Sequence, residues 1–250
     1  MTNKNLFLVL LFVTISSRAV KAEELSIRTD IYCPIACQPG ENPGLIPEIV
    51  IQTMTKHNVK VEYSLLNWAR SVEDTRAGKF NAIIGAAKSD APDFIFPEVA
   101  QAKVKFELFG LKDKPWTYKG SFSGKKIGVV NGYAYDPTVA KLIDSKAPEF
   151  VIVSGEAGLD SLVSMLKAGR IDFLYENSGV FQNWLDQHQA KFSDFSSAGA
   201  PAQDAQELFI AFGPKFKDAK KYAKWISEET KAMKANGQLE TLKKKYKLKF

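Results

Sequence analysis

Apolar and polar residues alternate between Leu25 and Asp30, and this alternation predicts a first β-strand. Further apolar runs are too short for helices, so they also predict strands. These runs occupy residues 59–65, 82–84, 103–111, 125–130, 150–153 and 208–212. Segments with helical spacing separate most of them, and a helical tail is expected from residue 216 onward. Strands that alternate with helices predict an α/β fold.

One pattern of elements occurs twice in the chain. In each copy a predicted helix ends in Ala-Gly-Lys or Ala-Gly-Arg, and then an apolar residue, Asn or Asp, and an apolar strand follow. The two glycines, Gly78 and Gly169, are 91 residues apart, which is too long for the period of a solenoid. A glycine that ends a helix is common on its own. Two copies with the same order of elements nevertheless favour two similar α/β lobes.

Two predicted strands end in residues that leave room for a ligand. Strand 82–84 is followed by Gly85, Ala86 and Ala87, where no large side chain keeps a ligand away from the backbone. Strand 125–130 is followed by Asn131-Gly132-Tyr133 and then by a helix, whose free N–H groups suit an anion or a polar group. The glycine and lysine spacing of dinucleotide or Walker motifs is absent. We expect a binding site at these tips, since ligands of open α/β sheets lie at the carboxyl ends of strands.

The first 22 residues have the features of a secretory signal peptide. Lys4 precedes an apolar run at residues 6–15, and Val20-Lys21-Ala22 is a small-x-small cleavage pattern. The alternative is a membrane anchor, but the apolar run is too short to span a bilayer. Removal of this segment lowers the formal net charge from +6 to +3, which does not favour nucleic-acid binding. We expect a mature chain in the periplasm.

Cys33 and Cys37 are the only cysteines in the sequence. An exported chain meets an oxidising compartment, where a close and even pair of cysteines usually forms a disulfide. Metal binding is the alternative, but the two histidines, His57 and His188, are far from the pair in sequence. We expect the disulfide, and no metal or cofactor.

Two aromatic residues and one arginine lie next to predicted strand ends. Tyr32 follows the first strand in a loop rich in Pro, Gly and Asn, where it either stacks on a ligand or covers the loop. Trp68 and Arg70 begin the helix after strand 59–65. They form either an apolar wall with an anion contact, or a half-buried ring beside a surface salt bridge. These alternatives stay open at the level of the sequence.

Four short motifs together resemble a known family. They are Ala-Gly-Lys-Phe-Asn-Ala-Ile-Ile-Gly at 77–85, Gly-Lys-Lys-Ile-Gly-Val at 124–129, Ala-Gly-Arg-Ile-Asp at 168–172 and Asn-Gly-Gln-Leu at 236–239. In this order and spacing they resemble the polar amino acid binding proteins of ABC importers (bacterial extracellular solute-binding protein family 3). The resemblance covers essentially the whole mature chain. The cysteine-pinned loop resembles a divergent branch of the family.

The resemblance implies a type II periplasmic binding protein fold with two lobes, each a mixed sheet flanked by helices. Residues 23–110 and 207–250 would form the first lobe, and residues 111–206 the second. Two extended crossings near residues 109–110 and 206–207 would join the lobes. A ligand would be captured in the cleft between them by hinge closure.

The resemblance also implies a set of residues around the ligand. Carried over by position, the wall of the first lobe consists of Tyr32, Trp68, Gly85 and Ala87. The wall of the second lobe consists of Gly132, Tyr133, Tyr135 and either Glu176 or Asn177.

The sequence departs from the family at both charged positions of the site. The family places an arginine a few residues after the position of Gly85 to hold the ligand carboxylate, and residues 88–93 contain none. The family aspartate that binds the ligand ammonium is replaced by Asn177, with Glu176 adjacent. An ordinary amino acid is therefore not expected as the ligand. Arg70 or Lys88 would take an anionic group instead, or Glu176 and the tyrosines would hold a cation.

Together these features lead to the hypothesis of a monomeric periplasmic binding protein that delivers a small polar solute to the membrane permease of an ABC importer. The sequence does not identify the solute. A sensor that reports its ligand to a membrane receptor is one alternative. An enzyme is another, because the same fold resembles cyclohexadienyl dehydratases. Its acid or base would be Glu176 or, as a second choice, Asp93, but no catalytic set is visible in the sequence.

Overall fold

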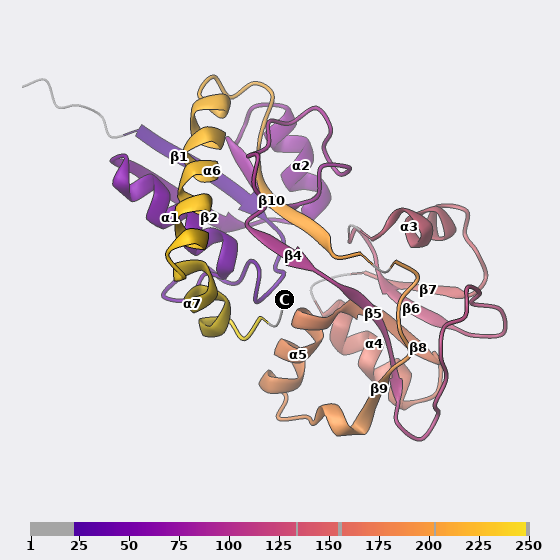
Figure 1. Ribbon diagram of the computed structural model, residues 1–250. Coiled ribbons are helices and arrows are strands. Elements are labelled where there is room, and N and C mark those ends of the chain that lie inside the picture. The colour runs from indigo at the N-terminus through magenta and orange to yellow at the C-terminus, as the bar shows by residue number, and fades with distance from the viewer. Residues whose placement is uncertain (1–22, 134, 155–156, 203, 249–250) are drawn as a thin grey trace, which may run out of the picture.

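The computed structural model describes residues 23–133, 135–154, 157–202 and 204–248. The predicted signal peptide, residues 1–22, lies outside this part of the chain. In the described ranges, no helix has both the length and the apolar character needed to cross a membrane. The described chain forms two lobes, each with its own β-sheet (Figure 1).

The first sheet has five strands in the order β2-β1-β3-β10-β4. These strands are β1 (Glu23–Thr29), β2 (Val59–Leu65), β3 (Ala82–Ala86), β4 (Ala102–Val104) and β10 (Gln206–Phe212). β1 pairs in parallel with β2 and β3, whereas β10 pairs antiparallel with β3 and β4. Leu25, Ile27 and Thr29 are buried, so the alternation in the sequence does mark the first strand.

The second sheet repeats this topology with the order β7-β6-β8-β5-β9. Its strands are β5 (Phe106–Leu111), β6 (Ile127–Val130), β7 (Phe150–Val153), β8 (Phe173–Asn177) and β9 (Phe195–Ser197). β6 pairs in parallel with β7 and β8, and β5 pairs antiparallel with β8 and β9. The prediction of an α/β fold with two similar lobes, each on a mixed sheet, is confirmed.

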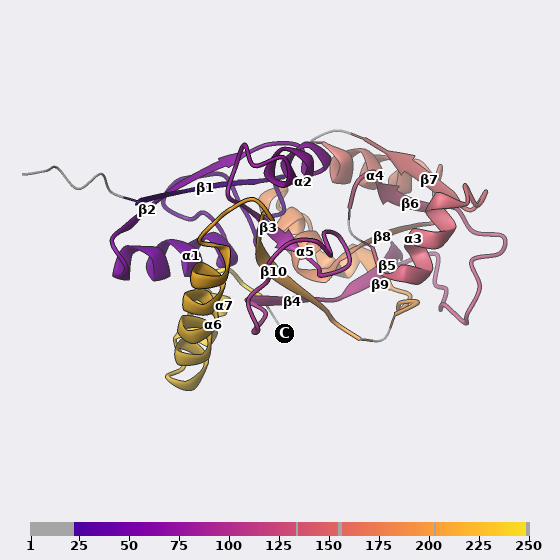
Figure 2. The ribbon, with the colours of Figure 1, turned by 90° about the horizontal axis from the view of Figure 1, so that it is seen from above.

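Helices flank both sheets (Figures 1 and 2). The first lobe has α1 (Leu45–Lys56), α2 (Trp68–Arg76), α6 (Ala219–Ala235) and α7 (Gln238–Lys245). The second has α3 (Pro137–Asp144), α4 (Gly158–Lys167), α5 (Ser178–Gln187) and a short 3-10 helix at Phe192–Asp194. The sequence repeat corresponds to α2–β3 and α4–β8. Gly78 and Gly169 have φ angles of 85° and 69°, which only glycine adopts readily, and they end the two helices.

The chain crosses from the first sheet to the second between β4 and β5, at Lys105. The apolar run 103–111, predicted as one strand, therefore divides between two sheets. The crossing lies before residues 109–110, because Phe109 already pairs with Leu174 in the second sheet. A second crossing leads from β9 back to β10. The division of the chain into moving lobes at residues 110 and 207 stays a prediction.

The helical tail packs on the first lobe and then reaches the second. Tyr222 and Ile226 of α6 are buried, as their spacing predicts. Beyond α7, the Lys247 Nζ lies 2.6 Å from the Asp186 Oδ2 on α5. The end of the described chain therefore contacts both lobes.

Two phenylalanines of the second lobe contact the ring of Phe109. Phe181 is fully buried with its ring centroid 4.3 Å from that of Phe109, whereas Phe192 is 46% exposed with a centroid distance of 6.1 Å. We expect Phe181→Ala to lower the free energy of unfolding by about 3–5 kcal/mol, because it leaves a cavity in the core. The control Phe192→Ala should lower it by about 1 kcal/mol or less. Urea denaturation followed by circular dichroism measures both, and equal losses would contradict this packing.

Candidate functional site

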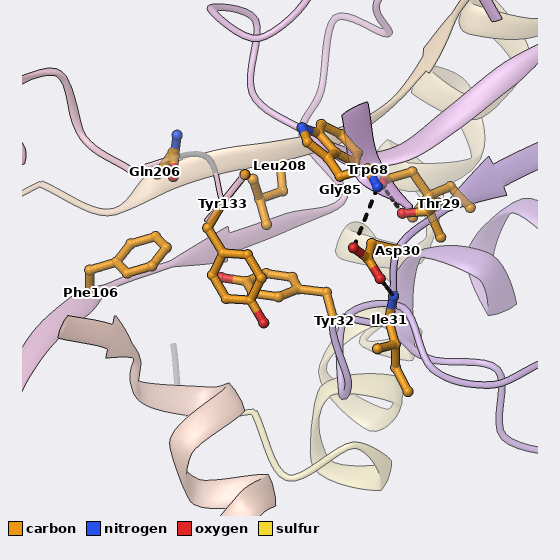
Figure 3. A pocket seen from close by; sticks show the side chains of 12 residues that line it. Thr29, Asp30, Ile31, Tyr32, Trp68, Gly85, Phe106, Tyr133, Gln206 and Leu208 are labelled. Atoms are coloured by element: carbon orange, nitrogen blue, oxygen red, sulfur yellow. Dashed lines mark hydrogen bonds between the residues drawn. The ribbon is translucent and has the colours of Figure 1, made fainter. Parts of the chain in front are cut away.

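A cavity of about 50 Å³ lies between the two lobes (Figure 3). Its lining residues come from strand ends and adjoining loops of both lobes. They are Thr29, Asp30, Ile31, Tyr32, Trp68, Ile84, Gly85, Phe106, Gly132, Tyr133, Gln206 and Leu208. A wider groove of about 540 Å³ shares Asp30, Ile31 and Tyr133 with this cavity. The two spaces therefore meet at Asp30.

The topology explains the position of the cavity. β1 and β3 are parallel neighbours, so their carboxyl ends, at Thr29 and Gly85, lie at one edge of the first sheet. The loop after β6 brings Gly132 and Tyr133 to the facing edge of the second sheet. Thr29 also donates a hydrogen bond from its hydroxyl to the Ile84 carbonyl oxygen at 2.7 Å, which ties the first two strand ends together. Ligands of open α/β sheets bind at such an edge.

The structure brings five of the predicted site residues together around the cavity. They are Tyr32, Trp68, Gly85, Gly132 and Tyr133. Gly85 and Gly132 have φ angles of 85° and 82°, so a side chain at either position would strain the backbone as well as narrow the cavity. The expected approach of a ligand to bare backbone at these two tips fits this geometry. The ligand contacts themselves remain predictions.

Three predicted residues of the first lobe do not line the cavity. The side chain of Arg70 is 69% exposed, and its Nε lies 3.4 Å from the Asp74 Oδ2. Of the two alternatives for Arg70, the structure therefore has the surface salt bridge. The Lys88 ammonium lies over the ring of Phe209, 5.1 Å from the centroid. Ala87 is buried in a turn, where its N–H donates to the Asp90 Oδ2 at 2.7 Å. The turn after β3 therefore directs this segment away from the cavity.

Two predicted residues of the second lobe are committed to its local structure. The Tyr135 hydroxyl accepts a hydrogen bond from the Val130 N–H at 2.8 Å, and its ring packs behind Phe106 with a centroid distance of 5.4 Å. The Asn177 Oδ1 accepts hydrogen bonds from the Gly179 and Val180 N–H groups and caps α5. Among the described residues, no group pairs with the buried Asn177 Nδ2.

Glu176 is fully buried and does not line the cavity. Its Oε1 accepts a hydrogen bond from the Asn177 N–H at 2.7 Å, while its Oε2 has no hydrogen-bond partner within the described ranges. Burial raises the pKa of this carboxyl to about 8, because water does not reach the charged form. Glu176 is therefore mostly protonated and neutral at pH 7.

A contact between two tyrosines joins the lobes across the cavity. The ring centroids of Tyr32 and Tyr133 lie 5.5 Å apart in an edge-to-face arrangement. Burial raises the pKa of both hydroxyls well above the usual value, and the negative charge of a nearby Glu176 raises each of them further. Tyr135 has the same two causes in the same order. Glu176 therefore lies within electrostatic reach of all three tyrosines.

The loop that carries Tyr32 is held in place by the predicted disulfide. Cys33 and Cys37 are bonded to each other, so this prediction is confirmed. The Tyr32 N–H donates to the Ala36 carbonyl oxygen at 2.8 Å, and the Tyr63 hydroxyl donates to the Cys37 carbonyl oxygen at 2.6 Å. The loop is thus fixed both to itself and to β2.

Seven residues of the cavity lining were not predicted from the sequence. Asp30 is the charged residue among them. Its Oδ1 accepts from the Ile31 N–H at 2.8 Å, and its Oδ2 accepts from the Trp68 N–H at 3.4 Å. The others are Thr29, Ile31, Ile84, Phe106, Gln206 and Leu208. The strand-end rule that selected Gly85 also applies to Asp30, which directly follows β1. Phe106, Gln206 and Leu208 lie at the beginning of β5 and β10, which follow the crossings, and they carried no such signal.

The lining of the cavity is largely apolar, with four aromatic side chains and one acidic side chain. Among the described residues that form it, Asp30 is the one charged side chain, and Lys and Arg are absent. In the same part of the chain, no group of three or more His, Cys, Asp or Glu side chains lies close enough to hold a metal ion. The arrangement suits the binding of a small ligand with polar or cationic groups.

The buried carboxyl of Glu176 makes a testable contribution to stability. Its pKa is raised from 4.5 to about 8, so the folded protein holds a proton that the unfolded chain releases between these values. The free energy of unfolding therefore falls as pH rises through this window. We expect Glu176→Gln to remove this fall and to stabilise the protein by up to about 5 kcal/mol above the window.

Urea denaturation at about pH 5 and about pH 9 measures this effect. Glu107 is the matched control, because it lies opposite Glu176 in the β5–β8 pairing and accepts a hydrogen bond from the Ser197 hydroxyl. Glu107→Gln should keep the pH dependence of the wild type. An equal pH dependence in Glu176→Gln would show that the carboxyl is not buried in the way described.

Comparison with known proteins connects this geometry to a fold. No family model matches the chain, and no curated protein matches it by sequence. Solved structures do match. An amino acid ABC transporter substrate-binding protein from Streptococcus pneumoniae, bound to L-arginine, shares 18% identity at a TM-score of 0.68, over 89% of this chain and 94% of its own.

Two further structures have the same fold. An ancestral amino acid-binding protein, described as a precursor of cyclohexadienyl dehydratase, shares 18% identity at a TM-score of 0.67, over 89% of this chain and 94% of its own. A histidine kinase sensor domain with similarity to periplasmic binding proteins shares 16% identity at a TM-score of 0.68, over 89% of this chain and 95% of its own. At such low identities the likeness establishes architecture alone: this chain has the two-lobed fold of the periplasmic binding proteins.

Proposed function

We propose that this protein is a periplasmic binding protein that captures a small polar solute between its lobes and delivers it to the membrane permease of an ABC importer. The observation that carries the proposal is the cavity, whose walls come from strand ends of both lobes. Tyr32 from one lobe and Tyr133 from the other meet across it. A site divided between two bodies closes on its ligand as the bodies approach.

Bending at the two crossings would open this site. One crossing is Lys105, and the other is the segment between β9 and β10. Bending there moves the first sheet and its helices as one body, and the second sheet with its helices as the other. Opening would break the contact between Tyr32 and Tyr133, and it would expose Asp30 to an incoming solute. Closure then excludes water from the cavity.

The charges around the cavity do not favour a standard amino acid as the solute. An α-carboxylate needs a cationic partner, best a forked arginine. Arg70 is paired with Asp74, and Lys88 lies over Phe209. The described residues that line the cavity contain no arginine or lysine. A solute that lacks the carboxylate fits this lining better.

The site of action and the partner follow from the same proposal. The segment 1–22 would direct export of the chain to the periplasm, where the disulfide forms readily. There the protein would act as a monomer. The fold supports a permease partner, because one similar structure is a substrate-binding protein of an amino acid ABC transporter. A membrane receptor is the alternative partner, supported by the similar sensor domain of a histidine kinase. Binding to purified permease or receptor domains distinguishes the two.

An enzyme of the dehydratase class is a second candidate, favoured by one observation. Glu176 has a pKa of about 8, so it would hold a proton at neutral pH as a general acid does. Its carboxyl, however, does not line the cavity. We therefore favour binding without chemistry, and we expect no turnover when the protein is incubated with prephenate or arogenate. Product formation would favour the enzyme.

A thermal-shift screen of residues 23–250 tests the proposed function. The panel contains amino acids, amines, organic acids and sugars. A true ligand at about a hundred times its dissociation constant should add about 2.7 kcal/mol of stability. Small-angle X-ray scattering should show a more compact particle with that ligand. If no class of solute stabilises the protein, the proposal of a binding protein is wrong.

Trp68 provides a matched test of the cavity. It lines the cavity, whereas Trp225 lies on α6 with its ring stacked on His57 at a centroid distance of 3.7 Å. We expect Trp68→Ala to reduce the ligand-induced thermal shift by at least half, because an aromatic wall is lost. Trp225→Ala should keep that shift, even if the melting temperature of the free protein falls. An unchanged shift in Trp68→Ala would mean that its ring does not contact the solute.

A further inference from the structure

The cavity has a negatively charged lining, and the proposed function does not yet say which solute this charge selects. Asp30 is the one charged side chain in the described lining, and it lies where the cavity and the wider groove meet. In the described part of the chain, no lysine or arginine forms an ion pair with it. The carboxylate accepts hydrogen bonds from two backbone N–H groups, those of Ile31 and Trp68. A carboxylate has about four acceptor positions, so about half of its capacity remains for a ligand.

Four of the other lining residues are aromatic. Tyr32 and Trp68 come from the first lobe, and Phe106 and Tyr133 belong to the second (Figure 3). The negative face of such a ring attracts an ammonium group that lies within about 6 Å, and the attraction grows when water is excluded. A cavity of this kind therefore favours a cation over a neutral group of the same shape.

The residue behind this lining carries a carboxyl group that is mostly protonated at pH 7. Glu176 is fully buried with one carboxyl oxygen that has no hydrogen-bond partner in the described structure. It lies close enough to Tyr32 and Tyr133 to affect their ionisation. The neutral Glu176 carboxyl therefore offers no counter-charge to an anion, and among the described residues of the cavity lining the negative charge comes from Asp30. An anionic ligand would face Asp30 with no cation to offset the repulsion.

We propose that the solute is a small organic cation without a carboxylate, and that its ammonium group contacts Asp30 in the cavity. This proposal rests on the proposed function. The small volume of the cavity, about 50 Å³, accommodates only a compact headgroup. The remainder of the ligand would lie in the wider groove next to Asp30.

Paired probes test this assignment on the unmodified protein. Choline is compared with betaine, which adds a carboxylate, and with 3,3-dimethylbutanol, which has the same shape without the charge. Cadaverine is likewise compared with lysine. Isothermal titration calorimetry measures the dissociation constants. We expect choline or cadaverine to bind at least about tenfold more tightly than its partners, since a removed or offset charge weakens the contact with Asp30.

Substitution of Asp30 tests the assigned contact. Asp30→Asn keeps one oxygen, which can accept from the Ile31 N–H or the Trp68 N–H, but removes the charge. We therefore expect it to weaken binding of the cation at least about tenfold. It should leave any binding of 3,3-dimethylbutanol unchanged. Asp93→Asn is the control, because Asp93 forms a surface ion pair with Arg76 at 2.8 Å and does not line the cavity. Thermal denaturation of each variant verifies that it is folded.

The outcomes separate this assignment from the proposed function. Equal or tighter binding of betaine, lysine or the neutral alcohol would overturn the cationic assignment, as would the absence of binding by both cations. If a sugar or an organic acid then stabilised the protein in the broader screen, the function of a binding protein would stand without it. If no solute of any class bound, both proposals would fail.

Discussion

Burial of an ionised carboxylate without a partner costs free energy. This cost determines the charge state of Glu176, which is buried behind the cavity between the lobes. Only one of its oxygens has a hydrogen-bond partner among the described residues, so the group retains its proton at neutral pH. The tyrosines around it keep theirs for the same physical reason. Among the described residues that line the cavity, Asp30 is the one charged side chain, and it also lines the groove.

The duplicated topology decides where such a surface can form. Each sheet has its parallel strands on one side and its antiparallel strands on the other, and the antiparallel strands continue into the crossings. The parallel strand ends of both lobes consequently face each other over the two crossings. Tyr32 and Tyr133 lie in the loops that follow such ends. The disulfide beside Tyr32 restricts its loop, and the rings of Tyr32 and Tyr133 meet in an edge-to-face arrangement.

The sequence predicted the parts of the fold and site that depend on local pattern. The repeat around Gly78 and Gly169 and the strand tip at Gly85 are of this kind. The run 103–111 was not resolved, because its composition is uniform while its two halves pair with different sheets. Ala87, Tyr135 and Asn177 were carried over by position, and each is held in local structure by nearby partners. Arg70 and Lys88 were proposed as cations for an anionic group, and nearby side chains hold both of them outside the cavity lining. Asp30 also directly follows a strand, but the prediction selected strand ends by their small residues and so did not include it.

The tail beyond α7 has a practical consequence. Lys247 belongs to the first lobe by sequence, yet its ammonium group touches Asp186 of the second. A fluorophore attached at position 247 would sense the gap between the two bodies, whereas a dye on α6 would travel with its own lobe. A purification tag at this end would lie next to the same contact between the lobes. Tags for solution work on this protein therefore belong before β1, at the amino-terminal end of the described chain.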